Sequence, residues 1–246
     1  MAKKDNKVVL AISLSAVSLA IAIFAGIATY KTNANCNDEK SFNTKVEKGI
    51  TAFIEKQNAK QNAPAAPVDP IEVSYEGAPI KGEKNAPVTI VEFSEYECPY
   101  CGRYVNGAYK EIVEKYIETG KVKYAFRNFP LAFHKNAMPA ATAALCARDQ
   151  KGDDMYFNYH DKLFGNQKAL DTATLKKYAK DLGLNESEFN TCLDSGKFDA
   201  QIAKDIAEAK EYGVRGTPAF YINGRMISGA QPFAAFEAII EEELKK

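Results

Sequence analysis

Two cysteines separated by two residues form the pattern in this sequence with the clearest chemical meaning, Cys98-Pro99-Tyr100-Cys101. The spacing is typical of a disulfide that is repeatedly made and broken, and also of one half of a zinc site. A structural zinc site needs a fuller ligand set than one pair, and the sequence has no second cysteine pair of this spacing. A purely structural disulfide is disfavoured, because so short a loop stabilises a protein by only about 2 kcal/mol. The pattern therefore predicts redox chemistry.

The residues around this pair predict how its two sulfurs differ. An apolar run at 88–93 is typical of a buried strand. Apolar pairs between 104 and 117 recur with helical spacing and predict a helix that follows the cysteine pair and ends at Gly120. Cys98 would then lie in the N-cap region of the helix, where free N–H groups and the positive end of the helix dipole stabilise a thiolate. Pro99 suits the first helical turn, because its missing N–H costs nothing there. We predict Cys98 to be the low-pKa, exposed nucleophile and Cys101 the more buried, resolving cysteine.

Glu92 interrupts the apolar strand shortly before the cysteine pair. A buried carboxylate is costly unless it has a partner or a chemical task. We predict that Glu92 accepts the proton of Cys101, directly or through water, with Lys123 on the neighbouring strand as its charge partner. The alternative is that Glu92 lies at a solvated strand end.

A second motif far along the chain, Gly216-Thr217-Pro218, opens the strand expected at 219–222. If the Thr217–Pro218 bond is cis, the backbone of Thr217 turns toward the cysteines and can pair with an extended substrate segment. If it is trans, the proline is incidental, and the sequence leaves the isomer open. We assign substrate contact to Pro99, Tyr100, Thr217 and Pro218.

The order of the expected elements predicts an α/β fold. Strands at 88–93 and 123–129 enclose the first helix and make a βαβ unit, with the cysteine pair at its strand-to-helix turn. Strands at 219–222 and 225–228 form a hairpin across Asn223-Gly224, and a helix follows at 232–244. Between these halves, about 136–212 carry only helical signals and are predicted to be an inserted helical subdomain. Its expected helices are 137–149, 155–164, 171–182, 186–193 and 200–212.

Several motifs in this order resemble the DsbA-like branch of the thioredoxin superfamily, over residues 75–246. They are Phe93-Ser-Glu-Tyr-Glu-Cys-Pro-Tyr-Cys101, Phe129-Pro-Leu131 with His134, Tyr159-His-Asp-Lys-Leu-Phe164, Gly213-Val-Arg-Gly-Thr-Pro218 and Phe220-Tyr-Ile-Asn-Gly224. The resemblance implies a thioredoxin fold with a helical insertion, and thiol:disulfide exchange on proteins in the bacterial periplasm. It implies a redox-active Cys98–Cys101 disulfide without a further cofactor, Pro218 as the cis-proline and Glu92 as the buried acid.

The dipeptide between the cysteines departs from the family's strongest oxidants. Those enzymes have Pro-His, whose imidazolium can donate to the thiolate, whereas Tyr100 offers a neutral hydroxyl. We therefore expect a weaker oxidant than DsbA, whose potential is about −120 mV. Thr217 before Pro218 is similar to the thioredoxin-like isomerases, while the strongest oxidases often have Val there. The resemblance thus implies an oxidase, an isomerase or an enzyme with both activities.

Residues 1–30 differ from the rest of the chain. Lys3, Lys4 and Lys7 precede an uncharged, largely apolar run at 8–30 that is long enough to cross a bilayer. The segment is predicted to be either a cleaved signal peptide or an uncleaved membrane anchor, with the remaining chain exported. Export would place the protein in the periplasm, anchored to the inner membrane if the segment is retained, where disulfides persist.

A predicted amphipathic helix, 36–62, and a proline-rich linker, 63–74, separate this segment from the main domain 75–246. The apolar face of the helix needs a cover, and we predict that it forms a homo-oligomer. The alternatives are docking onto the domain or lying at the membrane surface. The face consists of Phe42, Val46, Ile50, Phe53 and Ile54.

The remaining cysteines and histidines carry weaker signals. Cys146 and Cys192 both fall in the helical insertion, and in an exported protein we expect them to pair as a structural disulfide, although each could be a buried apolar residue. Cys36 is left for an intermolecular disulfide, lipidation or no role. His134 and His160 lack a metal-ligand pattern, so no metal site is predicted, and His160 is expected to pack within a helix.

Charge and composition indicate which classes of binding partner to expect. Lysine plus arginine and aspartate plus glutamate are equal at 32 each, so nucleic acid is not an expected partner. We expect unfolded or misoxidised exported proteins as substrates and a membrane redox partner. The alternative function is an oligomeric periplasmic chaperone or surface-associated binding protein, whose holding activity would survive replacement of both Cys98 and Cys101 by Ser.

Overall fold

The computed structural model describes residues 45–52 and 70–246. The chain divides into two units, Met1–Ala66 and Pro67–Lys246. In the first unit residues 45–52 are helical and Ile50 is 54% exposed. The rest of the predicted helix 36–62, the segment 1–30, Cys36 and residues 63–69 lie outside the described residues. Within the described ranges, no helix has both the length and the apolar character needed to cross a bilayer.

Within residues 70–246, five strands form one mixed sheet in the order β1-β3-β2-β4-β5. Their bounds are β1 (Ile80–Lys81), β2 (Val88–Ser94), β3 (Val122–Asn128), β4 (Ala219–Ile222) and β5 (Arg225–Ser228). β2 and β3 run parallel, as a βαβ unit requires, and the β4–β5 hairpin lies antiparallel beside β2. The predicted α/β thioredoxin fold is confirmed, and β1 is an added edge strand that the sequence analysis did not predict.

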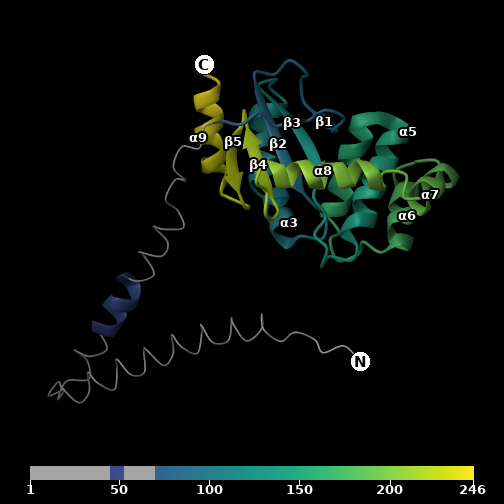
Figure 1. The fold of residues 1–246 in the computed structure, drawn as a ribbon, viewed down its shortest axis with the longest axis horizontal. Helices are drawn as coiled ribbons and strands as arrows, with labels where there is room; N and C mark the ends of the chain where they lie inside the picture. Colours follow the sequence, from purple (N-terminus) through teal and green to yellow (C-terminus); the bar gives the residue numbers. More distant parts are fainter. Residues whose placement is uncertain (1–44, 53–69) are drawn as a thin grey trace, which may run out of the picture. The chain divides into compact units, whose positions relative to one another are not determined.

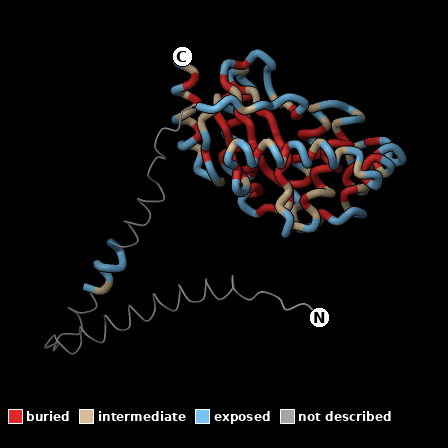
Figure 2. Tube along the Cα trace, in the orientation of Figure 1, coloured by how far each residue is buried: buried red, intermediate tan, exposed pale blue. Residues whose placement is uncertain are grey.

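Alternate residues of the central strands face two separate cores. Ile90, Tyr124 and Phe220 pack on the side of the helices that follow β2, the insertion and the C-terminal helix α9 (Phe233–Glu243). Val91 and Phe93 pack on the opposite side with α8 (Asp199–Glu211), which runs across the sheet in Figure 1. Figure 2 shows the strands buried between these two layers. The sheet thus has two covered faces, and neighbouring residues on a strand belong to different cores.

The helix after the cysteine pair, predicted to continue to Gly120, is interrupted. It consists of α3 (Pro99–Asn106), α4 (Ala108–Ile112) and a π-helical turn, η1 (Val113–Ile117). Gly107 separates the first two with non-helical dihedrals, φ −119° and ψ −107°. Glycine adopts such a conformation more readily than other residues, so the break falls there.

The inserted subdomain begins with a long kinked helix. The predicted helices 137–149 and 155–164 are joined as α5 (Ala137–Phe164), with a kink at Lys151 and Gly152, whose φ is +75°. The helices α6 (Thr172–Asp181) and α7 (Glu186–Asp194) follow, and Figure 1 shows them with α5 at one end of the sheet. Cys146 of α5 and Cys192 of α7 form a disulfide, which ties these two helices together.

α8 is fixed to the sheet by a buried ion pair. Arg127 of β3 is 2% exposed and places Nη2 2.7 Å from Oδ1 of Asp205 and 2.6 Å from Oε2 of Glu208. Asp205 also accepts the backbone N–H of Asn128 at 3.2 Å. The predicted insertion therefore closes back onto the α/β core through charged groups as well as apolar packing.

The end of the predicted linker 63–74 belongs to the domain. The N–H of Ile71 donates to the carbonyl of Gly224 at 3.1 Å, and Arg127 donates to the carbonyl of Ser74 at 2.9 Å. A side chain at Gly224 would collide with Ile71, because its Cβ would lie 2.3 Å from the Ile71 carbonyl oxygen. Residues 71–74 are therefore held against the domain by hydrogen bonds of their backbone groups.

Candidate active site

Cys98 lies at the junction between β2 and α3. It is the N-cap residue, with extended dihedrals (φ −69°, ψ 121°), and Pro99 begins the helix. The carbonyl of Cys98 accepts the first helical hydrogen bond, from the N–H of Gly102 at 3.1 Å. The free N–H groups of the first turn are thus available to the sulfur, as the sequence predicts for this position.

The pKa values of the two thiols are displaced in opposite directions. A hydrogen bond with Cys101 lowers the pKa of Cys98 from 9.0 to about 5, assisted by Thr217 and by the N–H groups of Cys101 and Tyr100, although burial opposes the change. Burial raises the pKa of Cys101 well above the usual range, and its hydrogen bond to Cys98 and the charge of Glu92 add to this. At neutral pH the pair therefore holds one thiolate, on Cys98, and one thiol.

The sulfur of Cys98 is more enclosed than predicted. Cys98 is only 3% exposed, so the expectation of an exposed nucleophile is wrong. The Thr217 carbonyl oxygen lies 3.5 Å from Cys98 Sγ, which brings the loop before β4 against the sulfur. This cover comes from a segment 119 residues away along the chain. Cys101 is fully buried.

The Thr217–Pro218 bond, whose isomer the sequence left open, is cis. The Thr217 hydroxyl oxygen is buried without a hydrogen-bond partner among the described residues. Tyr100 projects outward with 55% exposure, and the guanidinium of Arg103 lies 5.0 Å from its ring centre. The residues assigned to substrate contact therefore include an exposed ring and a backbone segment beside Cys98.

Glu92 is buried in the core and not at a solvated strand end. Burial raises its pKa from 4.5 to about 7, while hydrogen bonds with Tyr124 and Ser94 act in the opposite direction. The Tyr124 hydroxyl donates to Oε2, and Oε1 has no hydrogen-bond partner among the described residues. A carboxyl group with this pKa can both take up and release a proton near neutral pH.

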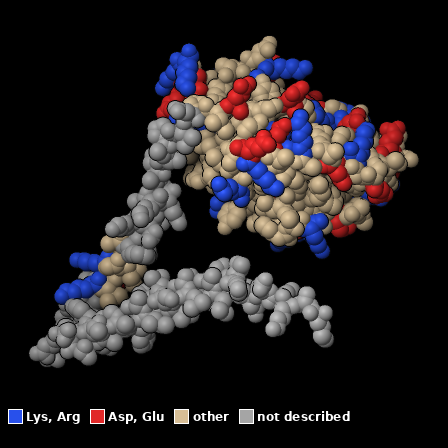
Figure 3. Space-filling model, viewed as in Figure 1, with Lys and Arg blue, Asp and Glu red and all other residues tan. Residues whose placement is uncertain are grey.

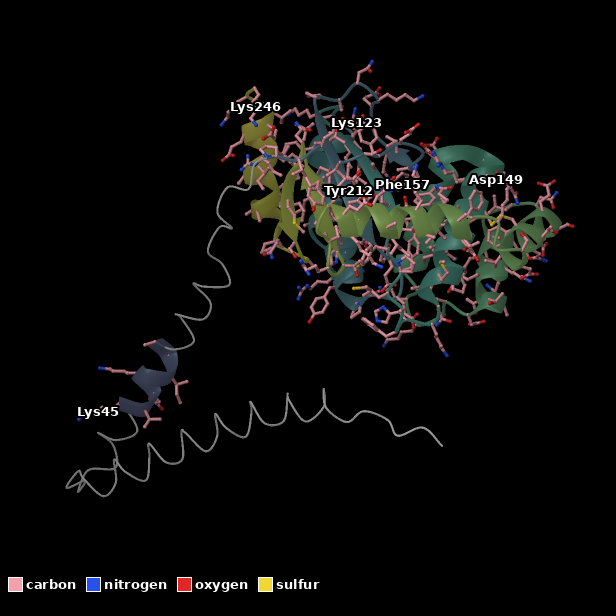
Figure 4. All side chains as sticks on the ribbon, in the orientation of Figure 1. Lys45, Lys123, Asp149, Phe157, Tyr212 and Lys246 are labelled. Carbon is pink, nitrogen blue, oxygen red and sulfur yellow. A yellow bond between two sulfur atoms is a disulfide. The ribbon has the colours of Figure 1, made fainter. Side chains whose placement is uncertain are left out.

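Lys123 is not the charge partner of Glu92, which corrects the prediction. Its Nζ donates to the carbonyl of Lys84 at 3.2 Å and lies 5.0 Å from the ring centre of Tyr75. Lys123 is labelled on β3 in Figure 4. Because successive residues on a strand point to opposite faces, Tyr124 and not Lys123 shares the face of Glu92.

The sequence analysis did not identify two carboxylates before Cys98 as part of the site. Glu95 is buried and contacts Nδ1 of His134, and it also accepts the N–H of Glu97 at 2.6 Å. Burial raises the pKa of Glu95, against the effect of these hydrogen bonds. Glu97 accepts the N–H of Asn136 at 2.7 Å. The two contacts join the active-site turn to the loop after β3, and the only sequence signal was the presence of His134 in a shared motif.

The other predicted residues lie away from this centre. The structure contains the Cys146–Cys192 disulfide in the insertion, with a sulfur–sulfur distance of 1.99 Å. His160 is fully buried among aromatic rings, including Tyr96 and Phe164. Across 45–52 and 70–246, no group of His, Cys, Asp and Glu side chains is arranged to hold a metal ion.

Comparisons with known proteins agree with this geometry. A family model described as Thioredoxin matches residues 74–242. The chain is 35% identical over 162 residues to the Na(+)/H(+) antiporter NhaA 3 of Salinispora tropica, but the match covers 65% of this chain and only 24% of that protein. It is 29% identical over 178 residues to Disulfide bond formation protein D of Bacillus subtilis, covering 70% of this chain and 79% of that one.

A solved structure shows the same arrangement. The crystal structure of oxidised BdbD from Bacillus subtilis superposes with a TM-score of 0.67 at 29% identity, covering 73% of this chain and all of that one. The family model spans both the α/β core and the insertion. The chain therefore belongs to the thioredoxin family, and within this family it is similar to the DsbA-like proteins.

Proposed function

We propose that this protein forms or rearranges disulfides in exported proteins by exchange at Cys98 and Cys101. The observation that carries the proposal is the opposite displacement of the two thiol pKa values, to about 5 for Cys98 and upward for Cys101. A thiolate at neutral pH is both the attacking group and a good leaving group in thiol–disulfide exchange. Cys98 therefore makes and breaks the bond to the client, and Cys101 is the thiol that resolves the mixed disulfide.

The oxidising direction begins with the Cys98–Cys101 disulfide. A client thiolate attacks Cys98 Sγ, the disulfide breaks, and its electron pair passes to Cys101, which takes a proton from Glu92. A second client thiolate attacks the client sulfur of the mixed disulfide and releases Cys98 as a thiolate. The client gains one disulfide and the protein gains two electrons. In reverse, Cys101 gives its proton to Glu92 and attacks Cys98, which releases a mixed-disulfide client.

The acidity of Cys98 favours the oxidising direction. A stabilised thiolate lowers the free energy of the reduced form and makes the disulfide a stronger oxidant. The corresponding pKa is about 7 in thioredoxin and about 3.5 in DsbA, so a value of about 5 lies between them. We place the reduction potential between those of the two proteins, about −270 and about −120 mV, in keeping with Tyr100 in place of a histidine.

Client binding would use the apolar surroundings of the site. Tyr100 is 55% exposed and Phe133, next to His134, is 78% exposed. Figure 3 shows mixed charges over much of the visible face and few charged side chains toward its lower part, where α3 lies in Figure 1. Unfolded proteins expose apolar side chains that can contact such a surface. The Thr217 backbone, beside Cys98, would pair with the client chain and assist isomerisation.

The proposed location is the periplasm, with residues 1–30 as the export signal or anchor. The Cys146–Cys192 disulfide supports an oxidising compartment. A membrane redox partner would reoxidise the cysteine pair. The segment 36–62, which precedes the linker in the sequence, would form a homo-oligomer. The main domain would begin near residue 71, where its hydrogen bonds begin.

The test is oxidative refolding of a reduced client protein by the purified full-length chain. We expect the native protein to accelerate disulfide formation, Cys98→Ser to abolish it, and Cys101→Ser to accumulate a mixed disulfide with the client. The double variant Cys146→Ser/Cys192→Ser controls for the loss of cysteines outside the site and should retain activity. Equal acceleration of client folding by Cys98→Ser/Cys101→Ser would contradict the proposal and favour a chaperone.

A further inference from the structure

Gln167, in the loop that follows α5 of the insertion, reaches the active-site turn. Its Nε2 donates to the carbonyl of Tyr96 at 3.0 Å and to the carbonyl of Cys98 at 2.8 Å. A side-chain amide has two N–H donors, so this one nitrogen satisfies the two carbonyls on either side of Glu97. Gln167 therefore connects the inserted subdomain to the backbone that carries the nucleophile.

Gly102 makes room for this contact. A Cβ at position 102 would lie 1.9 Å from Oε1 of Gln167, far inside van der Waals contact. The Gly102 N–H also donates to the Cys98 carbonyl, at 3.1 Å. Helix α3 begins at Pro99 and runs to Asn106, so residue 102 is a helical position at which most residues are more favourable than glycine. We call Gln167 and Gly102 together the Gln167 clamp.

The loop that carries Gln167 is itself held in place. Asn166 N–H donates to Leu163 O at 2.9 Å, and Ala169 N–H donates to Asn166 O at 2.8 Å, so consecutive turns follow the end of α5. Phe164, in the last turn of α5, packs against the ring of Tyr96 with centres 4.9 Å apart. The insertion thus contacts the active-site turn through both an aromatic pair and the Gln167 amide.

The Gln167 clamp contacts the peptide group beside the sulfur. The Cys98 carbonyl receives two donors, Gly102 N–H and Gln167 Nε2, so the peptide group between Cys98 and Pro99 is fixed. The N–H groups of Tyr100 and Cys101, which lower the pKa of Cys98, follow directly from that peptide. If a carbonyl oxygen turned toward the sulfur instead, its negative end would disfavour the thiolate.

We propose that Gln167 is a positioning residue of the redox site, which holds the turn that carries Cys98 with its N–H groups toward the sulfur and so makes the inserted subdomain part of the exchange machinery. The inference rests on the proposed function and adds a residue to it. Gln167 carries no charge, so its replacement by a neutral residue leaves the ionisable side chains near Cys98, which are Glu92, Glu95 and His134, in place.

The first test is Gln167→Met, which keeps the length of the side chain and removes both donors. The rate of alkylation of Cys98 by iodoacetamide is followed against pH on the reduced full-length chain, with peptide mapping to separate Cys98 from other cysteines. We expect the acid dissociation constant of Cys98 to fall about threefold to tenfold, the effect of losing one or two neutral hydrogen bonds. Asn166→Ala, in the same loop but without a contact to the turn, is the matched control and should titrate like the native protein.

The second variant, Gly102→Ala, displaces Gln167 without removing its amide. Alanine favours the helix more than glycine does, so thermal stability should be kept while the acid dissociation constant of Cys98 falls in the same direction. This variant tests the clamp even if Gln167→Met does not fold. If the pKa of Cys98 is low in the native protein and is the same in both folded variants, the positioning role is wrong and the proposed function stands. If the native Cys98 titrates as an ordinary thiol, the proposed function is wrong as well.

Discussion

The raised pKa of Glu92 predicts a measurable cost in stability. An ionised carboxylate in the core is disfavoured, which is why its pKa is about 7 and not 4.5. In the folded state this group therefore binds its proton more tightly than in the unfolded state. Its contribution to stability is fully present below pH 4.5 and is lost as the pH rises through about 7.

The size of this loss follows from the two pKa values. At about 1.36 kcal/mol per pH unit, the interval between 4.5 and about 7 corresponds to about 3 kcal/mol of unfolding free energy. Glu92→Gln removes the ionisation but keeps the shape of the side chain. The variant should therefore match the native protein near pH 4 and exceed its stability by about 3 kcal/mol near pH 8.

The assay is urea unfolding between about pH 4 and pH 8, in a Cys98→Ser/Cys101→Ser background. That background removes the titration of the active-site thiols and leaves the Cys146–Cys192 disulfide oxidised without added reductant. The surface substitution Glu83→Gln controls for the loss of one negative charge. The reasoning would be refuted if the free energies of unfolding of Glu92→Gln and its parent differed by the same amount at every pH. That result would mean that Glu92 ionises as easily in the core as in water.

Three other variants test Glu92 and the contacts that hold the insertion and α8. Tyr124→Phe removes the hydroxyl that donates to Glu92, so the pKa of Glu92 should rise further and the loss of stability should move to higher pH in the same urea series. Replacing both Cys146 and Cys192 by Ser removes the cross-link that closes a long loop, so the free energy of unfolding in urea should fall by about 4 kcal/mol. An unchanged free energy of unfolding would show that the disulfide does not stabilise the fold. Arg127→Met leaves the Asp205 carboxylate of α8 without its cation and should lower the free energy of unfolding by about 3 kcal/mol in the same measurement. A loss below about 1 kcal/mol would mean that the pair is solvated.

The strands and the hairpin could be predicted from the sequence because their signals are local. β2 is a nearly continuous apolar, β-branched run, and Asn223-Gly224 is a strong turn signal between β4 and β5. β1 has two residues and pairs only at the sheet edge, so it has no periodic pattern to detect. The break at Gly107 was also missed, since the apolar pairs continue with helical spacing on both sides of it.

The candidate site shows the same division between local and distant information. Cys98, Cys101 and Glu92 are close in sequence, and their types indicate their chemistry. Gln167 contacts the turn from 69 residues away, and the contact of His134 with Glu95 spans 39 residues. No spacing rule reveals such contacts, because they depend on how separate elements pack. The error at Lys123 has a simpler cause, because the register of β3 against β2 was unknown and one residue changes the face.

The central claim is that Cys98 is a thiolate at neutral pH, and direct titration of its sulfur tests this claim. The ultraviolet absorbance of the thiolate is followed against pH in the reduced protein, with the Cys98→Ser variant subtracted to isolate this residue. The account predicts a transition with a midpoint near the pKa of about 5. A midpoint close to the ordinary value of 9.0 would contradict it, because Cys98 would then be no more reactive than a free cysteine.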